Sequence, residues 1–171
     1  GMATQILPNN LGEICDALLL VIDDPKCGFK DIMGKLPGPD FPTGGIICGR
    51  QGIVDAYTKG RGHLVVRAKY EVEQSKKGRD NIIVTEIPYM VVKTGIVSKI
   101  ADCVRDGQIA EISDIRDESG RDGMRIVIEI KKDCDAEVAI NKLFQFTQLQ
   151  TTFAIANVAL VNNRPETLNI R

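Results

Sequence analysis

The side chains with the clearest potential for chemistry are a group of cations between residues 50 and 79. This stretch holds eight Lys and Arg residues against three acidic ones, a net charge of +5, and the rest of the chain sums to −6. A row of cations along an extended segment can follow the phosphates of a nucleic acid backbone. Phosphate contacts are therefore one interpretation of this stretch, with four main candidates and two weaker ones: Lys59, Arg61, Arg67 and Lys69, then His63 and Arg50.

The spacing of these residues suits an extended strand. His63, Arg67 and Lys69 share one strand face by the two-residue period. Gly60 and Gly62 would let the main chain come close to a phosphate, since neither carries a Cβ. The alternative is a solvated face of a β-hairpin that contacts no ligand, and the sequence does not separate the two.

The overall composition limits what kind of nucleic acid could bind. The net charge is −1 and the pI is about 5.9, which by themselves do not favour a free-standing nucleic-acid-binding protein. Aromatic residues make up only 5% of the chain and tryptophan is absent, so a platform for stacking single-stranded bases is not expected. If nucleic acid binds, we expect contacts to a duplex backbone, with an affinity that falls as salt rises.

The usual nucleotide and nucleophile motifs are missing. No phosphate-binding loop of the form G-x-x-x-x-G-K-[ST] occurs, and Gly60-Arg61-Gly62 begins a dinucleotide fingerprint only to meet Val65 at the third glycine position. The single histidine, His63, lies near Arg67 in the expected strand, where like charge disfavours a proton-accepting role. The tyrosines have no neighbours that would activate a hydroxyl: Tyr57, Tyr70 and Tyr89.

Metal and cofactor sites are not expected either. The acidic loop at 114–122 lacks the spacing of a calcium loop, and the arginines within and beside it predict paired charges in a connection between strands. The five cysteines are odd in number and widely spaced, which predicts reduced thiols in a cytoplasmic protein. We expect no catalytic residue, no cofactor and no metal ion in this chain.

Hydrophobic periodicity predicts an α+β fold with a largely antiparallel sheet. Apolar residues recur at helical spacing, or alternate with polar ones, in segments bounded by Gly, Pro, Asn and Asp. The expected helices cover residues 11–22, 29–36, 53–60, 96–107 and 136–144. The expected strand pairs are 63–72 with 81–87, 109–115 with 125–130, and 153–161 with 166–170.

The chain length fits one domain without a membrane anchor. At 171 residues it can bury a core of its own. The longest apolar run, residues 17–22, stops at Asp23-Asp24, far short of a membrane span. Gly1-Met2-Ala3-Thr4 carries no basic residue, so no signal peptide is expected.

Several stretches, in order along the whole chain, resemble the A subunits of bacterial type IIA DNA topoisomerases. They are Gly38-Pro39-Asp40-Phe41-Pro42-Thr43, Gly60-Arg61-Gly62, Glu86-Ile87-Pro88-Tyr89, residues 113–119, residues 121–128 and Thr147-Gln148-Leu149-Gln150. Residues 121–124 and 147–150 are more similar to gyrase than to topoisomerase IV, which remains the alternative. At Met90-Val91-Val92-Lys93 the family usually has Gln-Val-Asn-Lys, so two polar side chains are replaced here.

The resemblance implies a single tower-like domain over residues 1–171, with a helical part at 1–37 and an α+β part at 38–171 that contains a basic hairpin at 62–87. The parent enzyme would break a duplex through tyrosine links, pass a second duplex through and reseal the break. None of the three tyrosines has the family's arginine–tyrosine–threonine context, so this chain would not cleave DNA by itself.

The resemblance also implies the partners. These are double-stranded DNA, a second A subunit and the gyrase B subunit in a heterotetramer, with ATP and magnesium held by the B subunit. The domain would flank the DNA gate and support bent duplex DNA through its backbone. The other possibility is an architectural spacer that does not touch DNA.

Overall fold

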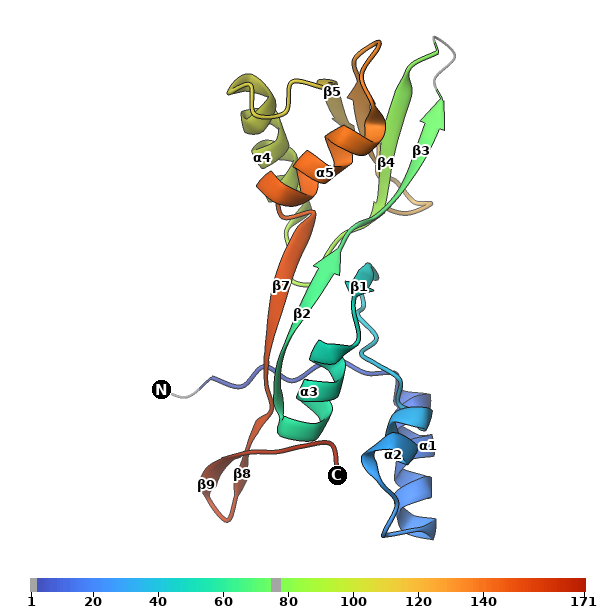
Figure 1. Ribbon diagram of the computed structural model, residues 1–171, viewed down its shortest axis with the longest axis vertical. Helices are drawn as coiled ribbons and strands as arrows, with labels where there is room; N and C mark the ends of the chain where they lie inside the picture. The colour runs from blue at the N-terminus through green and yellow to red at the C-terminus, as the bar shows by residue number, and fades with distance from the viewer. Residues whose placement is uncertain (1–2, 75–77) are drawn as a thin grey trace. The chain divides into compact units, whose positions relative to one another are not determined.

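The computed structural model describes residues 3–74 and 78–171, and it divides into two compact units (Figure 1). Unit 1 comprises Gly1–Pro42, Ile47–Val65 and Thr152–Arg171, and unit 2 comprises Thr43–Ile46 and Val66–Thr151. This grouping differs from the expected parts at 1–37 and 38–171, because residues 152–171 group with the N-terminal part of the chain. That the whole chain forms one tower-like domain stays a prediction.

The helices of unit 1 follow the sequence signals closely. Asn10 precedes the first helix, and its side chain accepts hydrogen bonds from the amides of Gly12 and Glu13, as an N-cap residue should. Gly60 ends the third helix in the left-handed conformation, with φ of 70°. The helices are α1 (Leu11–Asp23), α2 (Phe29–Lys35) and α3 (Gln51–Lys59).

The strands pair differently from what the sequence predicts at the end of the chain. β1 (Ile46–Cys48), β2 (Arg61–Arg67) and β7 (Gln150–Ala156) form one sheet in the order β1-β2-β7. β8 (Val158–Val161) turns back on β9 (Arg164–Thr167) in a separate hairpin. The expected pairing of 153–161 with 166–170 is therefore wrong for the first half of that segment, which pairs with β2 instead.

The expected basic hairpin at 62–87 is also wrong in part. Strand β2 ends before Ala68, whose amide donates a hydrogen bond to the carbonyl of Leu149. β3 (Lys69–Gln74) then begins in a different sheet. Only β3 pairs with β4 (Asp80–Glu86), whereas β2 belongs to the β1-β2-β7 sheet. Alternation of polar and apolar residues continues across Ala68, so the sequence has no sign of the break. Residues 75–77 of the predicted turn lie outside the described residues.

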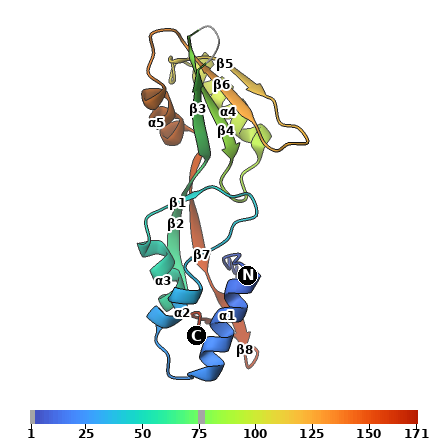
Figure 2. The same ribbon diagram turned by 90° about the vertical axis from the view of Figure 1, so that its right-hand side faces the viewer.

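Unit 2 is a four-stranded antiparallel sheet with two helices against it. The strand order is β3-β4-β6-β5, and β3 lies beside β4 in both views (Figures 1 and 2). The remaining elements of this unit are β5 (Ile112–Asp117), β6 (Ile126–Ile130), α4 (Lys93–Arg105) and α5 (Ala136–Phe146). Asp135 caps α5, since its carboxylate accepts from the amide of Glu137. The α+β class with antiparallel sheets is confirmed.

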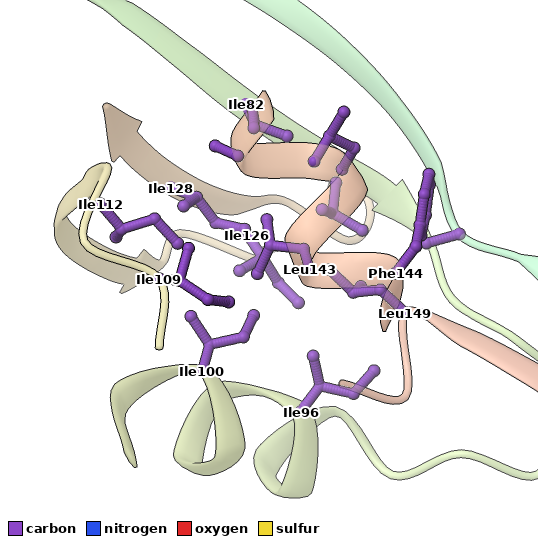
Figure 3. Close-up of a cluster of buried hydrophobic side chains, with 14 of the residues drawn as sticks. Ile82, Ile96, Ile100, Ile109, Ile112, Ile126, Ile128, Leu143, Phe144 and Leu149 are labelled. Carbon is purple, nitrogen blue, oxygen red and sulfur yellow. The ribbon is translucent and has the colours of Figure 1, made fainter. Parts of the chain in front are cut away.

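The core of unit 2 consists largely of isoleucine. Ile96 and Ile100 of α4 point toward Ile126 of β6 and Leu143 of α5, and all are fully buried (Figure 3). Ile82 and Val84 enter the same cluster from β4. Branched side chains suit strands because they lose little rotamer freedom there. None of the helices in the described ranges is long and apolar enough to cross a membrane.

The apolar face predicted for α1 is not a buried face. Ala17 is buried, whereas Leu11, Leu18, Leu19 and Ile22 are exposed. Cys15 is exposed as well, whereas Cys103 on α4 is buried.

Glu86, the first residue of the Glu86-Ile87-Pro88-Tyr89 motif, holds the loop that precedes β1. Its carboxylate accepts a 2.6 Å hydrogen bond from the amide of Gly45, and this bond, helped by Lys69, holds the pKa of Glu86 below its usual value. A Cβ on Gly44 would collide with the same carboxylate, and Gly44 has φ of 70°. The two glycines before β1 therefore let the loop close on Glu86.

Replacing Gly44 tests this contact. Gly44→Ala should lower the free energy of unfolding by about 1–2 kcal/mol for the left-handed backbone and by about 1 kcal/mol more for the displaced hydrogen bond. Gly49 is the matched control, because it has φ of 86° and no atom near its Cβ position. Urea denaturation of the two variants should show a larger loss for Gly44→Ala, and equal losses would contradict a role for Glu86.

Helix α4 begins at Lys93, directly after the replaced residues, without a side-chain cap. Val92 is the N-cap residue, has an extended backbone and makes no side-chain cap hydrogen bond. Val92 is exposed, so replacing it removes no packing.

Val92→Asn should therefore stabilise unit 2 by about 1 kcal/mol, because an Asn side chain can accept from the first free amides of α4. Val92→Ala controls for loss of the valine and should leave stability nearly unchanged. Urea denaturation of both variants measures the effect, and a Val92→Asn variant no more stable than Val92→Ala would contradict the capping argument.

Candidate nucleic-acid interface

Two glycines, Gly52 and Gly62, allow the backbones of α3 and β2 to come into direct contact. A Cβ on Gly52 would overlap the carbonyl of His63, and one on Gly62 would come within 2.6 Å of the carbonyl of Gly52. Gly60 is buried and lies against the carbonyl of Leu168. We expected Gly60 and Gly62 to allow close approach of a phosphate. Packing within unit 1 already requires glycine at both positions, so their presence does not indicate a phosphate.

This packing brings three of the candidate residues together. Lys59 ends α3, Arg61 begins β2, and His63 follows on the same strand. All three line one shallow depression, with Gln51, Gly52, Asp55 and Gly62 completing its wall. Arg61 and His63 are exposed on the strand, since the inward positions are those of Leu64 and Val66.

The three side chains differ in the hydrogen bonds and ion pairs that they already make. Lys59 Nζ lies 2.7 Å from Asp55 Oδ1, and this hydrogen bond is the main cause that lowers the pKa of Asp55. Arg61 donates one long hydrogen bond of 3.4 Å to Thr167 Oγ1, which leaves most of its donors open to solvent. Within residues 3–74 and 78–171, no hydrogen bond or ion pair engages the side chain of His63. Arg61 and His63 are therefore the most available groups.

Arg50 is not part of this depression. It precedes α3 and lines a different groove of unit 1, formed mainly by Phe29, Met33 and Val54. Its guanidinium has no hydrogen-bond or ion-pair partner in the described part of the chain.

Arg67 and Lys69 belong to unit 2, where both are used in packing. The Arg67 guanidinium lies 4.7 Å from the centre of the Phe144 ring and donates to Gln150 Oε1 at 2.7 Å. Lys69 Nζ lies 3.3 Å from Glu86 Oε1. The break at Ala68 and a register shift at Lys69 interrupt the predicted continuous row of cations.

Charges of the acidic loop at 114–122 are paired with arginines, as the sequence predicts, and Glu129 of β6 joins them. Arg116 contacts three carboxylates, those of Asp114, Glu118 and Glu129, and these interactions raise its pKa further. Lys93 is 2.7 Å from Asp117 and lowers the pKa of that carboxyl to about 2. Acid and base from β5, β6 and α4 thus neutralise one another.

Arg125 extends this network across the sheet. It makes a two-pronged contact with Glu73 of β3, with distances of 2.8 and 3.1 Å, and lies 3.4 Å from Glu118. The sequence could not identify Glu73 as its partner, because the two residues are 52 positions apart.

The sequence matches one protein family over its full length. Residues 1–171 match the family model for the A subunit of DNA gyrase/topoisomerase IV. Relatives include the DNA gyrase A subunit of Clostridium acetobutylicum, 54% identical over the whole of this chain and 21% of the relative. The DNA gyrase A subunit of Fibrobacter succinogenes is 53% identical over the whole chain and 19% of its own length.

A third relative gives the same result. The DNA gyrase A subunit of Streptococcus pneumoniae is 48% identical over the whole of this chain and 21% of the relative. The chain spans about a fifth of the length of the curated relatives it matches. By these matches, which cover every residue of it, the chain belongs to the family of DNA gyrase/topoisomerase IV A subunits.

Proposed function

We propose that this chain is part of the DNA breakage–reunion subunit of an ATP-dependent type II topoisomerase, and of gyrase rather than topoisomerase IV. Identities of 48–54% to gyrase A subunits support this assignment. The partners would be double-stranded DNA, a gyrase B subunit that holds ATP and magnesium, and a second A subunit, in the cytoplasm. The chain's own part would be to flank the DNA gate and support bent duplex DNA.

The depression between α3 and β2 is the observation that carries the DNA contact. Lys59, Arg61 and His63 converge there, and among the described residues that form its wall Asp55 contributes the one carboxylate. Because Asp55 already pairs with Lys59, the positive charge open to a phosphate is centred on Arg61. Such a contact does not recognise bases, which suits an enzyme that binds DNA of many sequences through its phosphates.

A spacer role has its own support in unit 2. Arg67 is engaged by Phe144 and Gln150, and Lys69 by Glu86, so these two cations stabilise the fold. We therefore place the phosphate contacts on the α3–β2 side and propose a structural role for Arg67 and Lys69. Arg50, separated from the depression, is a weaker candidate.

Arginine-to-alanine variants of the full-length protein test whether Arg61 contacts phosphate and Arg67 has a structural role. Arg61→Ala should weaken duplex binding and reduce the slope of log affinity against log salt by about 0.9, the change expected for one lost phosphate contact. Arg67→Ala should lower stability but leave the slope unchanged. Fluorescence anisotropy with a labelled duplex at several salt concentrations measures both.

Lys99→Ala is the matched control, because Lys99 is an exposed cation on α4 in unit 2. It should bind DNA like the unmodified protein. An unchanged slope for Arg61→Ala would favour the spacer role, and an equal drop for Lys99→Ala would show that only net charge matters.

The 171-residue chain alone should not cleave or relax plasmid DNA. Tyr57 is buried, its hydroxyl donates to Asn9 Oδ1, and burial raises its pKa, so it is no nucleophile. Agarose gels of supercoiled plasmid after detergent treatment measure cleavage, with the full-length protein and its B partner as the positive control. Linear DNA formed by the isolated chain would overturn this assignment.

A further inference from the structure

Helix α1 presents an unpartnered apolar stripe. Leu11, Leu18, Leu19 and Ile22 are 75%, 57%, 58% and 70% exposed, and Cys15 is exposed between them. Leu11, Cys15, Leu18 and Ile22 are spaced by four, three and four residues, which is the a/d spacing of a coiled-coil seam. Single exposed leucines are common on protein surfaces, but a continuous row on one helix marks an interaction site.

The neighbouring side of α1 is already occupied. Ala17 is buried, and Ile14, Leu18 and Val21 line a groove together with Ile32 and Leu36 of the α2 segment. Figure 2 shows α1 and α2 packed side by side. The helix is therefore held in place by this face. Leu18 lies at the border between the packed face and the stripe, and the large aliphatic side chains of the stripe stay exposed among the described residues.

The charges on α1 indicate what would pair with it. The helix carries Glu13, Asp16 and Asp23 and no Lys or Arg. Asp16 comes three residues before Leu19 and Asp23 four residues after it, so both are its neighbours on the helix surface and form an acidic edge along the stripe. Asp23 also lies in the last turn, where the helix dipole disfavours an anion and favours a cation.

A second copy of this chain fits the stripe poorly, because two acidic edges would then face each other without a cation. The curated relatives are about five times as long as this chain, so the remainder of the full-length protein is the larger source of a partner segment. A helix from that remainder would lie at high effective concentration, since it is covalently linked.

We propose that the α1 stripe is the seam for an amphipathic α-helix of the full-length protein that lies outside these 171 residues. Its apolar residues repeat at a/d spacing, and Lys or Arg residues flank them opposite Asp16 and Asp23. This contact is independent of DNA binding by the α3–β2 depression.

Cys15 is a native reporter for this seam. Maleimide labelling followed by peptide mass spectrometry should give a rate at Cys15 that is roughly ten-fold lower in the full-length protein than in the 171-residue chain, because a thiol within a helix pair reacts only when the helices separate. Cys134, half-buried in unit 2, is the internal control and should react equally in both. Equal rates at Cys15 would overturn the proposal.

Charge reversal tests the basic flank. In the full-length protein, Asp16→Lys with Asp23→Lys should raise labelling of Cys15, whereas Asp122→Lys, an exposed control in unit 2, should not. Slow labelling that survives the double reversal would overturn the charge assignment.

Sedimentation of the 171-residue chain tests whether a second copy of the chain covers the α1 stripe. The chain should remain monomeric over a wide concentration range. A dimer that Leu18→Glu abolishes would identify a second copy as the occupant and overturn the proposal.

Discussion

Backbone contact between α3 and β2 is the constraint on which the candidate site depends. Gly52 and Gly62 meet where any Cβ would overlap a carbonyl, so helix and strand approach more closely than side chains allow. Gly60 makes the turn between them possible, because a left-handed residue is needed directly after the helix. Lys59, Arg61 and His63 are brought around one depression by this turn.

The charges of the molecule fall into two classes with different consequences. In unit 2 the arginines at 116 and 125 and the lysine at 93 are matched to carboxylates across neighbouring strands. Exposed pairs of this kind contribute little each, but a connected network fixes side chains and restricts the strands that carry them. Around α3 and β2 the matching is incomplete, which leaves positive charge available to an anion.

Family membership gives these features a context. The chain spans about a fifth of the length of its relatives, and in our proposal the α1 stripe serves the remainder of the full-length protein. The isoleucine cluster of unit 2 is complete within the described residues, whereas α1 leaves large aliphatic side chains in water. Exposure of this kind is unfavourable in a finished assembly, since each such side chain contributes about 1.5–3 kcal/mol when buried.

Local features of the sequence determined the helices. Caps at Asn10 and Asp135 and the glycine after α3 act within one turn of the chain, so the helix positions follow from residues that are close neighbours. The α+β class and the paired charges of the loop at 114–122 could be predicted in the same way, from alternation and composition. The cations at 59, 61 and 63 could be named as candidates too, although the glycines beside them serve packing rather than phosphate approach.

Only the tertiary structure decided which strand pairs with which and which helix face is buried. The two-residue period of a strand is the same whichever strand pairs with it. It could therefore not show that β2 pairs with β7 or that the chain passes from one sheet to another at Ala68. The a/d pattern of α1 predicts an apolar stripe, but burial of that stripe requires a neighbour, and the pattern contains no information about one. Periodicity is a property of adjacent residues, whereas pairing and burial depend on residues far away along the chain.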